Sequence, residues 1–474
     1  MAPPLDDAPA GFSGWVQARE PVFPKAAHGR IRTAKWIVMA VLMAVYYGTP
    51  WLRWDRGPYA PHQAILIDMP HSKAYFFFFE IWPQEAYVLT GILVMMAIGL
   101  FLVTALAGRV WCGWACPQTV WTDLYFLVER LIEGDRTQRM RLARAPWSTH
   151  KIGLRLTKHA AWIVIAALTG GAWVLYFDDA PTVVHDIVTL HASTGVWATI
   201  GLLTAATYML AGWARENVCT FMCPYARFQG AMMDRDSLVV SYRPRRGEPR
   251  GKHRTGEGWE GRGHCVDCHQ CVEVCPTGID IRDGLQFGCI SCGLCIDACD
   301  SIMERLDLPR GLIDYDTERN LTAPEGTPKR WRFVRPRIVI YGLIYAGVGI
   351  GVLTVLLTRN ALDLNVLPDR NPLFVRLSDG AIRNNVTLKI LNKSNLPQRV
   401  TLSLDGLPDG RLSLLTSDDT TLEVKPDGVE TVRAFVTVPQ AAWHDAGKLD
   451  YSIAATDDAG AHTARHVDFT GPTR

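Results

Sequence analysis

Cysteine is absent from both ends of this chain. None precedes Cys112 and none follows Cys299, so all twelve cysteines lie in the middle of the 474 residues. Exported domains held by disulfides need cysteines in their exported parts. This distribution excludes a disulfide framework for the C-terminal part and favours metal or redox chemistry for the middle part.

An excess of one charge sign is also lacking. The chain has 49 Lys and Arg against 47 Asp and Glu, a formal net charge of +2. Such a balance gives no reason to expect nucleic acid as a partner. No G-x-G-x-x-G or Walker fingerprint occurs between a strand and a helix, so we expect no flavin, nicotinamide or ATP site.

Charged residues are missing from five apolar stretches, each long enough to cross the hydrocarbon core of a bilayer as a helix. These stretches are residues 36–52, 86–107, 160–177, 192–213 and 338–357. We therefore predict an integral membrane protein with five spans. The mostly polar segment before the first stretch does not match a cleaved signal peptide, so the first span is expected to act as an anchor.

Lys and Arg are unevenly distributed among the loops. The segment between the second and third stretches holds nine of them, whereas the loop Asp178–Leu190 has none. Because positive residues stay on the cytoplasmic side of a membrane, we expect the N-terminus, the segment between spans two and three, and residues 214–335 to be cytoplasmic. Everything after the fifth span is then expected outside.

This topology divides the chain into five parts. We predict a cytoplasmic segment 1–35, a four-helix membrane domain 36–213, a cytoplasmic segment 214–335, a fifth span 336–358 and an exported domain 360–474. The last part alternates apolar and polar residues in short runs such as "NVTLKILNKS" and "RVTLSLDGL", separated by Gly and Asp turns. Such a pattern predicts an all-β sandwich.

The strongest motif is a doubled cysteine run at about residues 264–305, "CVDCHQCVEVCP" followed by "CISCGLCIDACD". Both runs keep the spacing C-x2-C-x2-C-x3-C of two-cluster ferredoxins, in which the fourth cysteine of each run crosses to the other 4Fe-4S cluster. One predicted ligand set is Cys265, Cys268, Cys271 and Cys299, and the other is Cys289, Cys292, Cys295 and Cys275. A structural zinc site would need only four of these eight thiols. Asp300 stands where proline follows the last cysteine of the usual pattern, which puts the local geometry in question but not the ligands.

Two further cysteine pairs share another motif. "VWCGWACPQTVW" and "NVCTFMCPYARF" each follow an apolar stretch, and each has cysteines four residues apart before a proline. On a helix this spacing places both thiols on one face, and the proline can begin a new helix. The four candidate thiols are Cys112, Cys116, Cys219 and Cys223. Such soft ligands favour cuprous over cupric copper, and the nearby arginines Arg109, Arg215 and Arg227 would favour thiolate over thiol.

Methionines and histidines in or near the spans are weaker candidates. Met39, Met43, Met95, Met96 and Met209 lie in apolar helices, where thioethers mostly pack. His185 and His191 flank the short outer loop at a spacing of six, which does not place them on one helix face. We predict no haem from them.

The order of five spans, "WCGWACP", "CTFMCPY", the doubled ferredoxin run and a β-rich tail resembles the cytochrome c oxidase accessory protein family called CcoG, FixG or RdxA. The resemblance covers nearly the whole chain. It implies a bacterial inner-membrane protein with an immunoglobulin-like C-terminal domain that assists assembly of cbb3-type oxidase. It also implies reduction of cupric to cuprous ion as the activity.

These observations suggest one mechanism as a hypothesis. A cytoplasmic electron donor reduces two 4Fe-4S clusters, electrons reach copper at the four paired cysteines, and cuprous ion passes to a copper chaperone or a copper-exporting ATPase. The expected partners also include assembly factors of the oxidase.

Two other classes of function stay open. The chain also resembles ferredoxin-type membrane subunits that link quinol to an exported reductase, for which copper would be irrelevant. Alternatively, it is a scaffold whose clusters sense redox state while the β domain holds oxidase subunits.

Overall fold

The computed structural model describes residues 22–253, 258–324, 327–394, 396–407, 409–415, 419–443 and 448–472. The chain divides into two compact units. The first holds most of the helices and the cysteines, and the second holds the C-terminal strands with part of the segment between the first two apolar helices. Of the predicted N-terminal segment 1–35, residues 1–21 lie outside the described residues.

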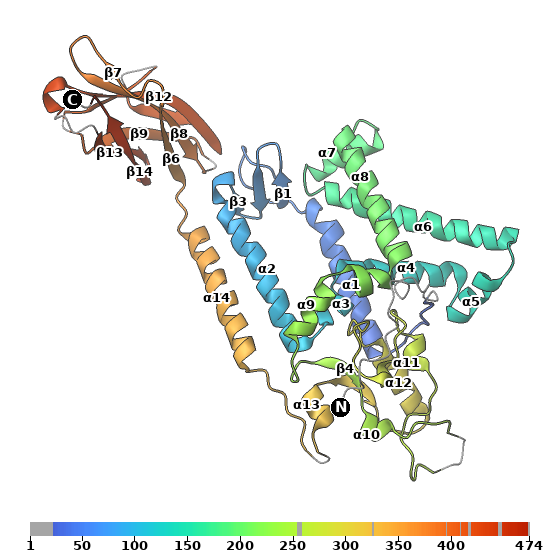
Figure 1. Ribbon diagram of the computed structural model, residues 1–474. Coiled ribbons are helices and arrows are strands. Elements are labelled where there is room, and N and C mark those ends of the chain that lie inside the picture. Colours follow the sequence, from blue (N-terminus) through green and yellow to red (C-terminus); the bar gives the residue numbers. More distant parts are fainter. Residues whose placement is uncertain are drawn as a thin grey trace, which may run out of the picture. The chain divides into compact units, whose positions relative to one another are not determined.

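Five helices are long and apolar enough to cross a membrane, which confirms the five predicted apolar helices. These candidate spans are Arg30–Trp51, Pro83–Ala107, Thr149–Val174, Thr194–Ala214 and Pro336–Leu357. Their α-helical parts are α1 (Arg30–Gly48), α2 (Ala86–Ala107), α6 (Thr149–Val174), α8 (Thr194–Thr207) and α14 (Pro336–Leu357). Figure 1 shows α6 running at a steep angle to α1, α2 and α14. The five helices are thus not a parallel bundle.

Shorter elements connect these helices. They are η2 (Thr49–Trp51), η3 (Pro83–Glu85), α3 (Val110–Trp114), α4 (Pro117–Glu133), α5 (Arg136–Arg144), α7 (Ala180–Val188), the π-helical η4 (Tyr208–Ala214) and η5 (Val218–Met222), and α9 (Tyr225–Met232). Helix α4 is amphipathic and buries Tyr125, Phe126 and Glu129 on one side. It packs against α6, where Tyr125 stacks on Trp162 with ring centroids 5.1 Å apart.

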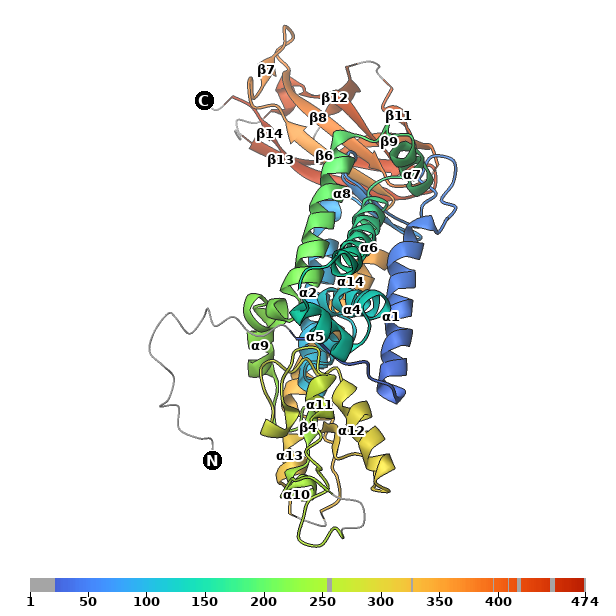
Figure 2. The same cartoon turned by 90° about the vertical axis from the view of Figure 1, so that its right-hand side faces the viewer.

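The ferredoxin-like module is a small α+β fold around a cysteine-rich core. Its elements are β4 (Val239–Tyr242), α10 (Pro244–Gly247), α11 (Gln270–Glu273), η6 (Ile281–Asp283), α12 (Leu294–Arg305), β5 (Ile313–Asp316) and α13 (Glu318–Thr322). Strands β4 and β5 pair antiparallel, with Val240 opposite Tyr315. Figure 2 shows the module at the end of the first unit near the beginning of α1.

The module is fixed to the first apolar helix by the side chain of Asp297. Its two carboxylate oxygens accept the backbone N–H groups of Ile31 (3.1 Å) and Arg32 (2.7 Å) at the beginning of α1. Asp297 lies on α12 between two cysteines and is 6% exposed. A carboxylate is favourable at a helix N-terminus, where backbone N–H groups lack partners inside the helix.

The C-terminal unit confirms the predicted β-rich domain. Its elements are β6 (Leu362–Pro368), β7 (Val375–Arg376), β8 (Ile382–Asn392), β9 (Gln398–Asp405), β10 (Arg411–Leu414), β11 (Thr421–Val424), β12 (Gly428–Val438), η7 (Gln440–Ala442), β13 (Lys448–Asp457) and β14 (His462–Thr470). One sheet has the order β10-β12-β8-β6, with β7 beside β8, and the other has the order β11-β9-β13-β14. Alternate residues such as Leu388, Val436 and Ile453 are fully buried between the sheets, as a sandwich requires.

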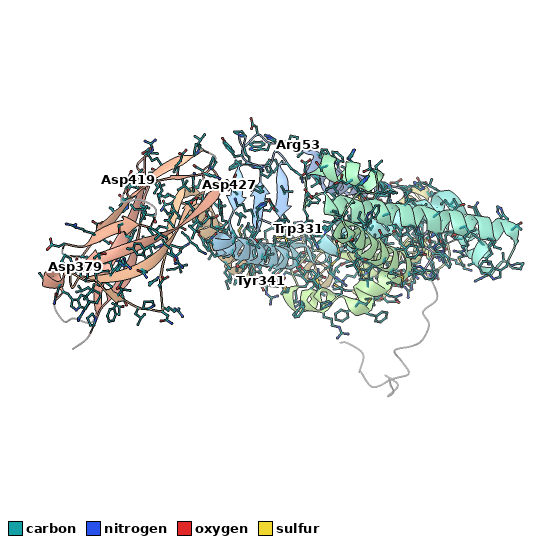
Figure 3. All side chains as sticks on the ribbon, turned by 90° about the horizontal axis from the view of Figure 1, so that it is seen from above. Arg53, Trp331, Tyr341, Asp379, Asp419 and Asp427 are labelled. Carbon is teal, nitrogen blue, oxygen red and sulfur yellow. The ribbon has the colours of Figure 1, made fainter. Side chains whose placement is uncertain are left out.

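The second unit also includes a small sheet that the sequence analysis did not predict. Strands β1 (Ile65–Asp68), β2 (Lys73–Phe76) and β3 (Phe79–Ile81) lie between the first two apolar helices in sequence. Lys73 Nζ forms an ion pair with Asp427 at 2.6 Å, and both side chains are 10% exposed. Figure 3 shows Asp427 at the edge of the sandwich that faces these strands.

Candidate metal centres

The two cysteine runs of the module fold in the same way. Asp267 and Ser291 have φ values of 54° and 53°, and His269 and Gly293 follow with 55° and 75°. Each of these residues occupies the same place in its run, so the repeat in sequence is also a repeat in backbone. Left-handed backbone is costly for residues other than glycine, and its recurrence here turns the successive cysteines of each run toward one cavity.

The structure groups the eight cysteines in the two crossed sets that the spacing predicts. One cavity is lined by the thiols Cys265, Cys268, Cys271 and Cys299, and a neighbouring one by Cys275, Cys289, Cys292 and Cys295 together with Cys271. The other walls are mainly apolar, including Met303 and Leu312 in the first cavity and Val240 and Ile279 in the second. Four thiols in an apolar cavity fit a 4Fe-4S cluster. Ligation by these residues stays a prediction.

Burial dominates the acidity of two of these thiols. It raises the pKa of Cys271 and of Cys289 to about 12. Without a metal these two thiols are therefore neutral at physiological pH, and metal binding must displace their protons.

Asp300 replaces the usual proline without disturbing the ligand set. Its carboxylate accepts the N–H of Gly311 at 2.8 Å, which fixes the chain returning toward β5. Unlike proline, aspartate keeps a backbone N–H, so α12 continues through this position to Arg305.

The two Cys-x3-Cys-Pro motifs form equivalent turns. Gly108 has φ 55° and ψ −127°, and Arg215 has φ 44° and ψ −120°, each four residues before the first cysteine of its motif. The N–H of Cys116 then bonds to the carbonyl of Trp111 (2.9 Å), and the N–H of Cys223 bonds to that of Val218 (2.8 Å). The Cys-x3-Cys-Pro motif that occurs twice in the sequence is therefore also a repeat of local structure.

Neither cysteine pair lies within a single helix, so the one-face geometry that a helix would give does not apply to them. Helix α3 ends at Trp114, and Cys116 is the extended residue before α4, with φ −61° and ψ 128°. Cys223 is likewise extended, with φ −78° and ψ 113°. Residues before proline avoid the helical region, so each proline ends one helical turn and begins the next.

The four turn thiols lie near one another, and Cys112 and Cys219 belong to one packed cluster. Burial is the largest cause that raises the pKa of Cys219 to about 11, and the charges of Cys116, Cys112 and Cys223 raise it further. Burial also raises the pKa of Cys112, although Arg109 and Gln229 oppose this. Arg109 thus acts on both thiols in the predicted direction, but desolvation exceeds its effect and both pKa values rise.

A buried amide that the sequence analysis missed connects the turns. Gln229 on α9 is fully buried, and its side chain lies 3.4–3.5 Å from the sulfur of Cys112. Arg109 Nε donates to Gln229 at 2.8 Å, and Nη1 of the same side chain donates to the carbonyl of Phe287 in the module. The second turn thus orients a cysteine of the first through α9.

The first turn touches the module at Gly113. A Cβ placed on this glycine would lie 2.5 Å from the carbonyl oxygen of Ile290 and 2.8 Å from the backbone of Cys292. Beside this contact, Trp114 Nε1 donates to the hydroxyl of Tyr315 (3.2 Å), which donates to the carbonyl of Ser291 (2.7 Å). The turn thiols therefore lie next to the second cysteine cavity, an arrangement that spacing alone did not predict.

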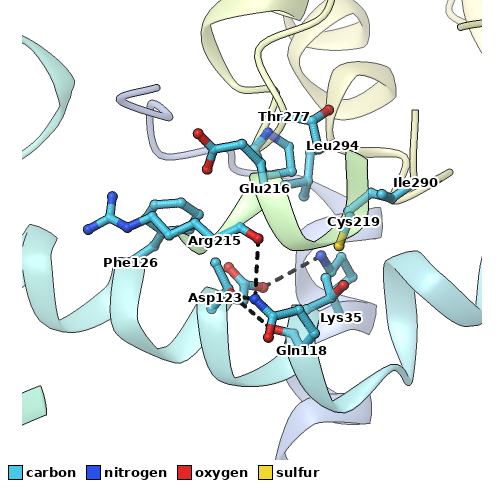
Figure 4. Close-up of a pocket in the computed structure, with 13 residues that line it drawn as sticks. Lys35, Gln118, Asp123, Phe126, Arg215, Glu216, Cys219, Thr277, Ile290 and Leu294 are labelled. Atoms are coloured by element: carbon cyan, nitrogen blue, oxygen red, sulfur yellow. Dashed lines mark hydrogen bonds and ion pairs between the residues drawn. The ribbon is translucent and has the colours of Figure 1, made fainter. Parts of the chain in front are cut away.

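Figure 4 shows a pocket beside Cys219. Its walls come from α1, α4 and the second turn, and from Thr277, Ile290 and Leu294 of the module. Lys35 Nζ lies 3.5 Å from Asp123. Burial alone would raise the pKa of Asp123, but Lys35 and Arg32 hold it below its usual range. The acid and the lysine of this pocket are thus already paired with each other.

We call the four turn thiols an open set, because only Cys219 of the four lines a described pocket, and that pocket has charged walls. Among the described residues, the module cysteines included, no three His, Cys, Asp or Glu side chains meet closely enough to hold a single metal ion. The weaker candidates do not join the thiols: Met96 and Met209 are 67% and 55% exposed, and His185 is paired with its neighbour Asp186.

Comparison with known proteins shows where similar sequences occur. Family models match residues 214–318 as a 4Fe-4S dicluster domain, residues 89–133 as a 4Fe-4S binding domain, and residues 352–472 as an IG-like fold at the C-terminus of FixG. The nitrogen fixation protein FixG of Rhizobium meliloti is 48% identical over 93% of this chain and 90% of that protein. Protein RdxA of Cereibacter sphaeroides is 49% identical over 93% of this chain and 94% of its own. Protein RdxB of the same organism is 48% identical over 91% of this chain and 90% of that protein.

Proposed function

The chain belongs to the FixG/RdxA family of iron–sulfur electron-transfer proteins, and from this premise we propose that it reduces cupric to cuprous ion at Cys112, Cys116, Cys219 and Cys223. The substrate ion takes one electron and loses one unit of charge. One observation carries the proposal: the first of two equivalent turns meets the backbone beside the second cysteine cavity, and the four turn thiols lie near enough for their charges to affect one another.

The eight module cysteines hold two 4Fe-4S clusters in this proposal, which supply one-electron transfer when bound. The apolar walls around them keep water away from the thiolates. Gly113 permits the close approach of the first turn to the backbone between Cys289 and Cys292. A side chain at residue 113 would separate the two sets of cysteines.

The turn thiols bind the product, cuprous ion, in preference to the substrate, cupric ion. Soft sulfur ligands favour cuprous ion, whereas cupric ion prefers nitrogen and oxygen ligands. Gln229 and Arg109 hold Cys112 in place, and the paired charges of the adjacent pocket present no free carboxylate from Asp123 to compete for the ion. An open set of thiols also allows the reduced ion to leave.

The position of the site suits transfer at a bacterial inner membrane. Both turns follow apolar helices at the end that meets the module, and the positively charged segment between α2 and α6 favours a cytoplasmic location for this end. The β-rich unit would then lie in the periplasm. We expect a copper chaperone or copper-exporting ATPase to accept cuprous ion for assembly of cbb3-type oxidase.

The deciding experiment is anaerobic cupric reduction by the purified full-length protein, reduced beforehand and freed of excess reductant. Cuprous ion is measured with a chelator specific for that state. A variant with all four turn cysteines changed to serine should keep its iron and its visible absorbance but produce no cuprous ion above buffer. Equal cuprous yield from the parent and this variant would remove copper reduction from these residues.

A further inference from the structure

A second cavity, of about 390 Å³, lies where α4, α6 and η4 meet. It adjoins the pocket at Cys219, since Arg215 and Glu216 line both cavities. Its size is in the range of small-molecule sites. Neither the proposed copper chemistry nor the ferredoxin-like module uses it.

Charged groups in this cavity are balanced and mutually paired. The three acidic and three basic residues of its lining are Glu129, Glu133, Glu216, Arg155, Lys158 and Arg215. Lys158 Nζ lies 3.1 Å from Glu133, and Arg215 lies 2.5 Å from Glu129. An anionic ligand would have to break such pairs at high cost, so the lining favours a neutral ligand.

Aromatic rings and two available polar groups define that ligand further. Trp162 is 2% exposed, and its Nε1–H has no hydrogen-bond acceptor within the described chain. His159 stacks on Trp213 with ring centroids 5.9 Å apart, and Tyr208 engages its Nδ1 at 3.0 Å. Its Nε2 has no partner among the residues described. A flat ring that carries hydrogen-bonding oxygens would satisfy both groups.

The wall of the cavity that Trp213 forms borders an apolar surface. Trp213 is 60% exposed, and Met209 and Leu156 on the same two helical segments are 55% and 65% exposed. These side chains lie on helices apolar enough to cross a membrane. A ligand with a flat polar head and an apolar tail could therefore enter from lipid.

We propose that this cavity binds the head of a membrane quinol, which would be the electron donor for the copper reduction proposed above. Oxidation breaks two O–H bonds and gives a quinone, two protons and two electrons. His159 Nε2 would accept one proton and the second would pass to water, while two one-electron iron–sulfur acceptors held by the module cysteines would take the electrons. This donor would come from the lipid and not from the cytoplasm, where the sequence analysis placed it.

The test measures binding of decylubiquinone to the full-length protein in detergent by equilibrium dialysis, with no copper present. Trp162→Phe keeps a ring but removes the N–H, and His159→Phe keeps a ring beside Trp213. Loss of one hydrogen bond should weaken binding about tenfold in each variant. Trp443→Phe is the matched control, because the indole N–H of Trp443 also lacks an acceptor among the described residues but lies in the β sandwich. Its affinity should equal that of the parent.

Unchanged affinity in both cavity variants would overturn the proposal. A second result would also overturn it: the parent retains phosphatidylglycerol, Arg155→Gln loses it, and both bind decylubiquinone equally well. The cavity would then be an anionic-lipid site. Anaerobic addition of decylubiquinol should also bleach the iron–sulfur absorbance of the parent faster than that of either variant. Because these assays contain no copper, the quinol site and the copper site can fail independently.

Discussion

The chain uses cysteine in two contrasting ways. The eight module cysteines come from one short stretch and line two apolar cavities as complete sets of four. The four turn cysteines come from segments separated by a hundred residues of sequence and lie beside Arg109, Gln229 and a pocket with charged walls. Both sets are built by duplication, but only the first is closed.

This difference indicates two roles. Apolar walls around a complete ligand set favour a metal cluster that stays, because water and competing ligands are excluded. An open set with neighbouring polar groups favours an ion that arrives and leaves. The contact of Gly113 with the backbone of Ile290 and Cys292 joins the two sets at their nearest point.

Loss of one ligand from each set should separate the roles most strongly. Cys292→Ser removes a ligand from the closed set, so we expect the iron content to fall by about half, from about eight to about four atoms per chain. Cys219→Ser removes a thiol from the open set and should leave iron unchanged while lowering cuprous yield. Iron and acid-labile sulfide analysis measures the first effect. An equal loss of iron in both variants would show that the turn cysteines also hold a cluster.

The contact between the sets can be broken without touching a cysteine. Gly113→Val places side-chain atoms against the backbone of Cys292, and overpacking of this kind costs about 1–3 kcal/mol. We expect a lower thermal unfolding temperature and a large loss of copper reduction, with the iron content retained. Gly171→Ala is the control, since nothing lies within 4 Å of its added Cβ. Full copper reduction by Gly113→Val would show that close approach is unnecessary.

The sequence predicted most of what is local. The cysteine spacing predicted the two crossed sets because it matches that of two-cluster ferredoxins, in which the fourth cysteine of each run crosses to the other cluster. Apolar length predicted five helices, and alternation predicted the sandwich. Each of these inferences depends on neighbours in sequence, so the pattern is visible before the fold is known.

Long-range contacts could not be predicted in this way. Nothing in "WCGWACP" indicates that Gly113 meets Ile290, and nothing in the α12 sequence indicates that Asp297 binds the start of α1. The spacing of four would place each cysteine pair on one face of a helix, but each proline holds the cysteine before it in extended backbone and ends the helix there. The pairing of Lys73 with Asp427 joins residues more than 350 positions apart.

The two equivalent turns should differ in their tolerance of substitution. Gly108 has a positive φ, and its added Cβ would lie 2.8 Å from the carbonyl of Leu238. Gly108→Ala should therefore cost about 1–2 kcal/mol. Arg215 adopts the same backbone but is held by an ion pair with Glu129 and lies over the ring of Phe126. Arg215→Gly relieves the positive φ but removes this ion pair from the buried Glu129, so it should lower the thermal unfolding temperature at least as far as Gly108→Ala. A smaller fall would show that the ion pair does not hold the second turn.

The smallest effect is expected from a change at the contact between Asp297 and the start of α1. This change tests whether that contact of the module, in addition to the one at Gly113, affects copper reduction. Asp297 lies between Cys295 and Cys299 but binds only the start of α1, so Asp297→Asn keeps the shape and weakens two hydrogen bonds from backbone N–H groups. Loss of charge at these bonds should cost about 1 kcal/mol. We expect a slightly lower unfolding temperature with unchanged iron and unchanged copper reduction. If copper reduction instead falls as far as in Gly113→Val, the orientation of the whole module limits the reaction, and the single contact between open and closed cysteines does not.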